Sequence, residues 1–225
     1  MSDHPLDRPV WHALTGVQAH LAARHGDAVR IDPEIGLFAA AGPEGQHDLV
    51  VLTRATGRQS WLLETDLVEP PPGLSRLRSA PLTQMVAAEL LLEDSGEGVA
   101  GLGDNDAPEM FALARATEPG PWERGTHRYG GYYGIREGGR LVAMAGTRLR
   151  PTRTLAEVSG VCSYPEVRGR GFARRLMIRV MQDMAARGET PFLHCYSSNV
   201  RAIALYRTMG FKVRRELVVS VMELA

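Results

Sequence analysis

One glycine-rich turn carries the residue types best suited to binding a charged ligand. It reads Pro165-Glu166-Val167-Arg168-Gly169-Arg170-Gly171-Phe172-Ala173 and joins a strand-like run to the most regular helical pattern of the chain. Glycines let a backbone approach a ligand closely, and the free N–H groups at the start of a helix favour an anion. The turn therefore predicts a diphosphate site, and the alternative is a tight turn that binds nothing.

Two common phosphate motifs do not fit this turn. A P-loop requires Gly-x-x-x-x-Gly-Lys-Ser/Thr, and no Lys-Ser/Thr pair follows the glycines. A dinucleotide fingerprint that starts at Gly169 requires Gly or Ala at its sixth position, which is Arg174. The turn is therefore predicted to hold its anion in another way.

A second group of candidate residues follows downstream, where Asn199-Val200-Arg201-Ala202-Ile203-Ala204-Leu205-Tyr206 leads into Met209-Gly210-Phe211. Together with the turn, this segment resembles the GNAT superfamily of acyl-CoA-dependent N-acyltransferases, whose signature is Arg/Gln-x-x-Gly-x-Gly/Ala. Arg168, Gly171 and Ala173 match that signature, after a strand and before a helix. The resemblance covers roughly Val99 to Ala225 and looks closest to the glycine N-acyltransferase-like branch.

The resemblance implies a binding mode for acetyl-CoA or another acyl-CoA. Backbone N–H groups of the turn would hold the pyrophosphate, and the strand that contains Val161 would pair with the pantetheine arm. Gly160 would mark a bulge that parts two strands, and a backbone N–H near Val161 would stabilise the oxyanion. Asn199 would face the cofactor, although it also suits a helix N-cap. The implied cofactor residues are Val161, Cys162, Ser163, Arg168, Gly169, Arg170, Gly171, Phe172, Ala173 and Asn199.

The resemblance also implies two catalytic residues. Tyr206 occupies the position of the tyrosine that protonates the departing CoA thiolate, and the alternative is a core aromatic on an amphipathic helix. Glu157 lies on the strand where several family members carry a carboxylate that acts as a base. Its alternative is a solvent-facing or ion-paired strand residue. Transfer in the family is direct attack by the amine through a tetrahedral intermediate.

Other candidate residues have simpler interpretations. An aromatic cluster could line an acceptor pocket, or it could only pack near a hairpin: Trp122, His127, Tyr129, Tyr132 and Tyr133. His194 is predicted to be structural, and Cys162 and Cys195 to be small core residues rather than nucleophiles. No His or carboxylate spacing calls for a metal, so none is predicted.

The elements that must position these residues follow from periodicity and turn signals. We expect an α/β fold with α+β mixing: a mostly antiparallel sheet flanked by helices, a GNAT fold with an N-terminal α+β extension. Residues 1–93 form that extension, for which a partial or degenerate copy of the same fold is one interpretation, and 94–225 form the acetyltransferase domain.

Individual elements are predicted as follows. Helices are expected over 7–26, from Asp106, over 171–187 and over 200–209. Strands are expected over 28–31, 36–41, 48–53, 60–64, 132–135, 140–149, 155–163, 191–196, 210–214 and 217–224. Residues 94–98 read as a loop, and 82–92 fit either a helix or a strand.

Composition limits the classes of partner. Lys plus Arg equals Asp plus Glu at 26 each in 225 residues, so no net charge attracts nucleic acid or an anionic membrane. The start of the sequence lacks the features of a secretory signal, and no apolar run reaches the ~20 residues of a membrane span. A cytoplasmic protein is expected, as a monomer or homodimer.

The predicted activity is transfer of an acetyl group from acetyl-CoA to a primary amine of a small molecule. One alternative is an acyl-CoA-binding regulatory module without turnover. The retention of both Asn199 and Tyr206 argues against it, because a pure binder needs no acid. A peptide or protein N-acetyltransferase is the second alternative, and it differs only in the acceptor.

Overall fold

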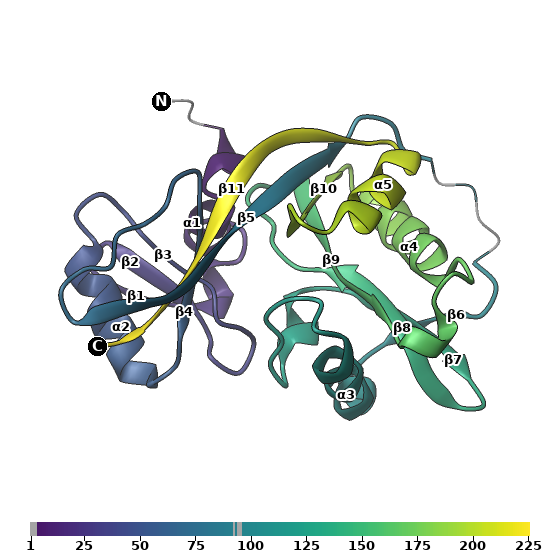
Figure 1. The fold of residues 1–225 in the computed structure, drawn as a ribbon, viewed down its shortest axis with the longest axis horizontal. Helices are drawn as coiled ribbons and strands as arrows, with labels where there is room; N and C mark the ends of the chain where they lie inside the picture. The colour runs from purple at the N-terminus through teal and green to yellow at the C-terminus, as the bar shows by residue number, and fades with distance from the viewer. Residues whose placement is uncertain (1–3, 92, 94–95) are drawn as a thin grey trace.

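One eight-stranded sheet runs through most of the molecule, with the strand order β4-β11-β5-β10-β9-β8-β7-β6. The structure, a computed structural model, describes residues 4–91, 93 and 96–225 (Figure 1). Every neighbouring pair in this sheet is antiparallel except β10 with β9, which is parallel. A smaller sheet has the order β1-β2-β3. The mostly antiparallel α/β fold predicted from the sequence is confirmed.

The described helices are α1 (Pro9–Thr15), α2 (Gln46–Thr56), α3 (Ala107–Thr117), α4 (Phe172–Ala186) and α5 (Val200–Thr208). The strands of the first half are β1 (Ala22–His25), β2 (Ala28–Ile31), β3 (Ala39–Ala41), β4 (Ser60–Glu64) and β5 (Leu74–Ala87). Those of the second half are β6 (Val99–Leu102), β7 (Tyr132–Glu137), β8 (Arg140–Thr147), β9 (Leu155–Ser163), β10 (Thr190–Tyr196) and β11 (Phe211–Leu224).

Strands β5 and β11 form a long antiparallel ribbon that crosses the molecule (Figure 1). Each has 14 residues, and their register runs from Ala87 opposite Phe211 to Leu74 opposite Leu224. One end of the ribbon pairs with β10, and the other end pairs with β4. A strand from the first half of the chain therefore lies between two strands from the second half.

Helices cover both faces of the C-terminal part of the sheet. Helix α4 presents Leu176, Val180 and Met184 to one face, where they are fully or almost fully buried. These residues recur every four positions, which is the spacing of one face of a helix. Helix α3 buries Met110 and Leu113 on the opposite face, against Met144 of β8.

The second large cluster of buried side chains draws on both halves of the chain. Leu6, Val10 and Trp61 from the first half pack with Phe192 and Leu217 from the second half. Since apolar burial is the main favourable term in folding, this cluster joins the N-terminal region to the sheet energetically as well as by hydrogen bonds.

Several local predictions are confirmed, and three are wrong. The predicted strands over 28–31, 60–64 and 155–163 coincide with β2, β4 and β9. The first helix ends at Thr15 rather than near Gly26, the predicted strand over 48–53 is part of helix α2, and the two strands expected after 210 are one strand, β11. Most of the undecided stretch 82–92 belongs to β5, while residues 92, 94 and 95, next to the predicted domain boundary, lie outside the described residues.

Each error has a physical cause. In α2, Leu49, Val50 and Thr53 are buried at spacings of one and three residues, and Gly57 ends the helix in the left-handed conformation at φ 62°. Four consecutive apolar residues had suggested a buried strand, a pattern that periodicity cannot separate from a helix. In β11, the interruption near Arg214 is a register shift between Val213 and Arg215, which the pairing with β5 bridges.

In the part of the chain that the structure describes, no helix has the length and apolar character needed to cross a membrane.

A fragment that begins at Gly96 tests whether the second half can fold alone. Removing β5 leaves facing edges of β10 and β11 unpaired and strips part of the shared core. We expect this loss to exceed the ~5–15 kcal/mol that stabilises a typical domain, so the fragment should be insoluble or lack a cooperative thermal transition by circular dichroism. A chain that lacks only residues 1–3 is the control, and cooperative unfolding of the Gly96 fragment would contradict the expectation.

Candidate functional site

A cleft opens where β9 and β10 part. The two strands pair only from Leu155 to Glu157 with Thr190 to Phe192. Beyond that point a bulge in β9 sets Gly160 and Val161 against the single residue Ala145 of β8. Gly160 has φ 64°, and a side chain there would come within 2.9 Å of Trp122 and Tyr132. The bulge predicted at Gly160 is therefore present, and the cleft beside it has a volume of about 640 Å³.

The cleft brings together most of the residues that the resemblance implied. Ten of the twelve predicted site residues line it: Val161, Cys162, Ser163, Arg168, Gly169, Gly171, Phe172, Ala173, Asn199 and Tyr206. Arg170 points elsewhere and forms an ion pair with Glu137, with 2.9 Å between Nη1 and Oε2. Glu157 lies beneath the cleft and does not line it.

The glycine-rich turn has the conformation of an anion cradle. Gly169 and Gly171 adopt φ angles of 82° and 79°, and nothing lies within 4 Å of where a Cβ would stand on either residue. Gly171 caps α4, and the first turn of that helix contains no acidic residue. The N–H groups at this helix start therefore face an open cleft with the positive end of the helix dipole behind them.

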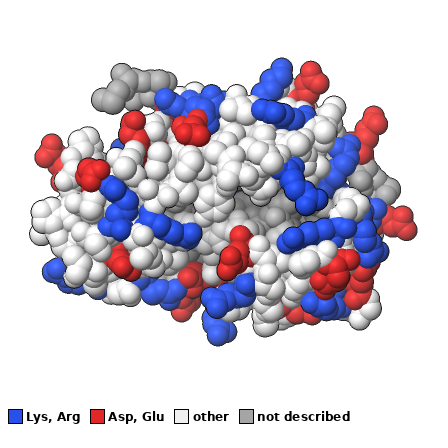
Figure 2. Space-filling model, in the orientation of Figure 1, with Lys and Arg blue, Asp and Glu red and all other residues white. Residues whose placement is uncertain are grey.

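Three arginines add positive charge to the same cleft. Arg168, Arg174 and Arg201 all line it. On the face drawn in Figure 2, basic side chains border a hollow near the middle of the molecule. Because guanidinium groups match phosphate oxygens in geometry and charge, this rim suits a ligand with several phosphates.

Asn199 and Tyr206 lie at the start and near the end of α5. The side chain of Asn199 accepts a hydrogen bond from the backbone N–H of Ala202 at 3.1 Å, so it caps the helix while it lines the cleft. Tyr206 is 9% exposed and packs against the ring of Phe211, with ring centroids 6.2 Å apart. Burial raises the pKa of the Tyr206 phenol, which therefore keeps its proton at neutral pH.

Glu157 is the centre of a buried polar row that crosses the sheet. Its Oε1 accepts from Nη2 of Arg148 and from Nδ1 of His194, both at 2.7 Å, and its Oε2 accepts from Nε of Arg148 at 2.8 Å. The row continues from Nε2 of His194 to the amide of Gln84 at 2.9 Å, and Arg214 donates to that amide's oxygen at 2.8 Å. The ion-paired alternative describes Glu157 in this structure, and a role as base stays a prediction.

Opposing effects act on the carboxyl of Glu157. Burial alone raises its pKa, but the charge and hydrogen bonds of Arg148, together with the hydrogen bond from His194, outweigh burial and hold the pKa far below its ordinary value. The group is therefore a carboxylate at every pH near neutrality, with its oxygens already occupied. A direct proton transfer to it would require this ion pair to open.

The predicted aromatic cluster lies outside the cleft. Trp122 packs edge-on against Tyr132 with centroids 5.3 Å apart, the hydroxyl of Tyr133 donates to Asp183, and His127 pairs with Asp104 at 2.7 Å. Tyr129 is buried. Packing and surface pairing account for these residues in this structure.

Both cysteines are weakly acidic thiols. Burial raises the pKa of Cys162 to about 12 and that of Cys195 to about 11. Thiols with such values are poor nucleophiles at neutral pH. Cys162 is buried as predicted, whereas Cys195 is half-buried and lines the cleft. Among the described residues, no group of three or more His, Cys, Asp or Glu side chains could hold a metal ion.

A smaller pocket that the sequence did not indicate adjoins the cleft. It has a volume of about 60 Å³ and shares five residues with the cleft: Pro119, Arg148, His194, Cys195 and Tyr196. The first half of the chain and the ribbon supply Phe38, Trp61, Leu63, Leu82 and Val219, and a turn after α3 supplies Pro119, Gly120 and Pro121. The walls come from segments distant in sequence, so no local pattern could indicate the pocket.

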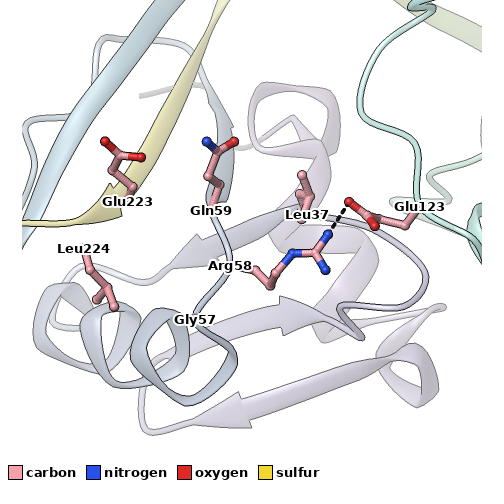
Figure 3. A pocket seen from close by; sticks show the side chains of 7 residues that line it. All are labelled: Leu37, Gly57, Arg58, Gln59, Glu123, Glu223 and Leu224. Carbon is pink, nitrogen blue, oxygen red and sulfur yellow. Dashed lines mark ion pairs between the residues drawn. The ribbon is translucent and has the colours of Figure 1, made fainter. Parts of the chain in front are cut away.

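A separate crevice of about 520 Å³ lies by the N-terminal region (Figure 3). Arg58 points across it toward Glu123, and the two side chains form an ion pair at 2.6 Å. None of the predicted site residues lines this crevice, so the chemistry expected from the sequence concentrates in the cleft.

Comparison with known proteins agrees with this geometry. Residues 132–219 match the family model described as FR47-like protein. A solved structure of a GNAT-family protein from Novosphingobium aromaticivorans is 51% identical, with a TM-score of 0.95 over 99% of this chain and 100% of the other. A GCN5-related N-acetyltransferase from Kribbella flavida shares the fold at 18% identity, with a TM-score of 0.57 over 90% of this chain and 88% of the other.

A curated relative matches a shorter stretch of the chain. N-alpha-acetyltransferase RimI of Mycobacterium tuberculosis is 42% identical over 83 residues, which are 36% of this chain and 51% of that protein. The chain thus spans about half the length of this relative. These matches define the class of protein: the structure has the GNAT acetyltransferase fold. The chain belongs to the GNAT family.

Replacing Glu157 by Gln tests the buried ion pair. The change leaves Arg148 buried without its counter-charge, and we expect the free energy of unfolding to fall by about 3–5 kcal/mol at pH 7. Because the pKa of Glu157 is lower in the folded chain than in the unfolded chain, the pair's contribution is complete above the ordinary value of 4.5 and decreases as the pH falls below it. The difference between the two proteins, measured by urea unfolding, should therefore narrow below pH 4.5.

The matched control is Glu166→Gln. Glu166 forms an ion pair with Arg140 in which both side chains are more than half exposed, so water screens the pair and the change should leave the free energy of unfolding nearly unchanged. Equal effects of the two substitutions would show that the buried pair has no special role.

Proposed function

We propose that this chain transfers an acetyl group from acetyl-CoA to a primary amine of a small molecule. The observation that supports this most directly is the coincidence of two features in one cleft. The parted strands β9 and β10 leave room for an extended pantetheine arm, and the two-glycine turn faces the same space at the start of α4. A tight turn without a ligand would need neither the open space at both glycines nor the basic rim.

The residues present fit the CoA group. Backbone N–H groups from Arg168 to Ala173 would hold the pyrophosphate, and Arg168, Arg174 and Arg201 stand where further phosphate charge could be compensated. Val161 to Ser163 would offer main-chain groups to the pantetheine amides, and Asn199 would contact the arm from the other side.

The chemistry requires one bond to form and one to break. The neutral amine nitrogen attacks the thioester carbonyl, whose oxygen a backbone N–H near Val161 would stabilise, and the carbon–sulfur bond then breaks. Tyr206 would donate its proton to the leaving sulfur and recover it from the solvent, while the amine releases its extra proton to water. A thiol with a pKa of ~8.5 leaves as a thiolate at pH 7 at a penalty of only ~2 kcal/mol, so this acid assists the reaction without being essential.

The Mycobacterium tuberculosis relative is an N-alpha-acetyltransferase, which favours a second acceptor class, the α-amine of a peptide or protein. Activity on peptides but on no small amine would favour peptide or protein acetylation over the acetylation of a small molecule. The glycine N-acyltransferase-like branch stays a prediction. A regulatory module without turnover would bind acetyl-CoA but release no thiol with any amine.

Calorimetric titration with acetyl-CoA, desulfo-CoA and free diphosphate tests the cofactor site. We expect saturable binding of acetyl-CoA that Gly171→Glu abolishes, because the new carboxylate would repel the diphosphate at the helix start. Gly188→Glu is the matched control, since Gly188 also has a positive φ, 70°, with open space around it but does not line the cleft. Equal losses in both variants, or no binding of any CoA species to the wild type, would overturn the proposal.

Tyr206→Phe tests the acid. The ring keeps its packing against Phe211, so we expect an unchanged Kd for acetyl-CoA and a kcat reduced by at most about 30-fold at pH 7, the equivalent of the ~2 kcal/mol thiolate penalty. The deficit should shrink as the pH rises through ~8.5, where the thiolate leaves without help. A deficit that is independent of pH, measured by thiol release, would argue that Tyr206 only packs.

A further inference from the structure

The small pocket beside the cleft is placed to receive the acceptor, an argument that rests on the proposed function. Five residues line both hollows, so the hollows meet there: Pro119, Arg148, His194, Cys195 and Tyr196. An amine must reach the thioester carbonyl from outside the volume that the cofactor fills. The pocket is therefore where the remaining atoms of the acceptor would lie.

Away from the junction with the cleft, the walls of the pocket are apolar. Phe38 and Trp61 form an aromatic wall, and Leu63, Leu82 and Val219 complete it. No Asp or Glu lines the pocket, so a second ammonium group on the acceptor would lose its water without gaining a partner. The lining thus favours an apolar substituent, and the volume of about 60 Å³ favours a small one.

Arg148 supplies a charged hydrogen-bond donor with spare capacity at the junction. Its Nε and Nη2 are both committed to Glu157, which holds the guanidinium in a fixed plane. Nη1 makes no hydrogen bond within the described residues, and a Cβ built on Gly120 of the pocket wall would lie 3.8 Å from it. The guanidinium also packs over the ring of Phe38 at 4.8 Å. A rigid, charged N–H group next to the pocket calls for an oxygen acceptor on the ligand.

The imidazole of His194, which also lines both hollows, has no such capacity. The amide nitrogen of Gln84 donates to its Nε2, so its Nδ1 carries the ring proton and donates to Glu157. Both ring nitrogens are engaged. Of the two residues in this buried ion pair that line both hollows, Arg148 is therefore the one with a free N–H group for the acceptor, and the uncharged hydroxyl of Tyr196 lies at the same junction.

We propose that Arg148 is an acceptor-positioning residue, and that the acceptor is a primary amine with a small apolar substituent and an oxygen acceptor close to the amine. Nη1 of Arg148 donates to that oxygen, which is either a carboxylate or an uncharged carbonyl, and the apolar substituent fills the pocket. The amine is then held at the junction with the cleft. The first half of the chain contributes to specificity through Phe38, Trp61 and Leu63.

Four amines of similar size test this acceptor class by thiol release from acetyl-CoA. Leucine carries a carboxylate, leucinamide carries an uncharged carbonyl, 3-methylbutylamine lacks the oxygen, and 1,5-diaminopentane carries a second cation. With kcat/KM expressed per unprotonated amine, so that differences in basicity cancel, we expect leucine or leucinamide to exceed both of the others by at least about 10-fold. The better of the two identifies the oxygen. Equal or better turnover of 3-methylbutylamine or the diamine would overturn the inference and leave the acetyltransferase function standing. No turnover of any amine, with acetyl-CoA bound, would overturn both.

Arg148→Lys tests the residue itself. Lysine keeps a charge for Glu157 but lacks the planar fork, so KM for the oxygen-bearing amine should rise at least about 10-fold while acetyl-CoA affinity changes less than 2-fold. The ratio of kcat/KM for the oxygen-bearing amine to kcat/KM for 3-methylbutylamine should fall by the same factor. Because this ratio is compared between the wild type and the variant, differences in amine basicity cancel. Arg150→Lys, in an ion pair with Glu189 outside both hollows, is the control. An equal loss for 3-methylbutylamine would show that Arg148 is only structural.

A second pair of variants keeps the pocket testable if Arg148→Lys does not fold. Val219 lines the pocket, whereas Val221, two residues further along β11 and equally buried, does not. Val219→Leu should lower kcat/KM for leucinamide at least about 10-fold and spare the smaller alaninamide, while Val221→Leu should change neither. Equal effects of the two substitutions on both amines would place the acceptor elsewhere.

Discussion

The carboxylate of Glu157 lies inside the sheet without access to water, and a charge in that position is tolerated only with close partners. Arg148 and His194 provide them, and Gln84 and Arg214 continue the row across the neighbouring strands β10, β5 and β11. Each polar side chain in the row forms a hydrogen bond with the next one. The row thereby specifies which side chains must stand opposite one another in adjacent strands, something that apolar contacts alone specify less strictly.

The same interaction sets the geometry of the site. Because Glu157 occupies two of the three nitrogens of Arg148, the guanidinium cannot rotate away from the junction of the two hollows. The cleft exists for a different reason: β9 and β10 pair over only three residues of each strand before the bulge at Gly160 bends β9 aside. A buried charge pair and a break in strand pairing, a few residues apart in β9, thus produce a fixed polar wall and an open space next to each other.

The parts of the molecule that could be predicted are those encoded locally. The turn from Arg168 to Ala173 combines left-handed glycines with the start of an amphipathic helix, and both signals lie within a few residues of one another. The small pocket could not be predicted, because Phe38, Trp61 and Val219 meet only through the folded sheet. Helix α2 was mistaken for a strand because its apolar run fits both periods, and β11 was divided because its irregularity at Arg214 is repaired by pairing with a distant strand. Sequence could place Glu157 on its strand but not reveal that two partners occupy it, since Arg148 and His194 reach it from separate strands or their ends.

The ribbon of β5 and β11 has a consequence for how the protein is made on the ribosome. Strand β5 ends at Ala87, and the strand that pairs with most of its length begins only at Phe211, after all the other strands of the described chain have been synthesised. Until then β5 presents an open edge, and β10 can cover only part of it. Contacts between segments so far apart in sequence form slowly, and exposed strand edges invite association with other chains. The nascent chain therefore depends on its last strand to close the sheet. Release from the ribosome before that strand is made would leave an incomplete, aggregation-prone chain rather than a smaller folded protein.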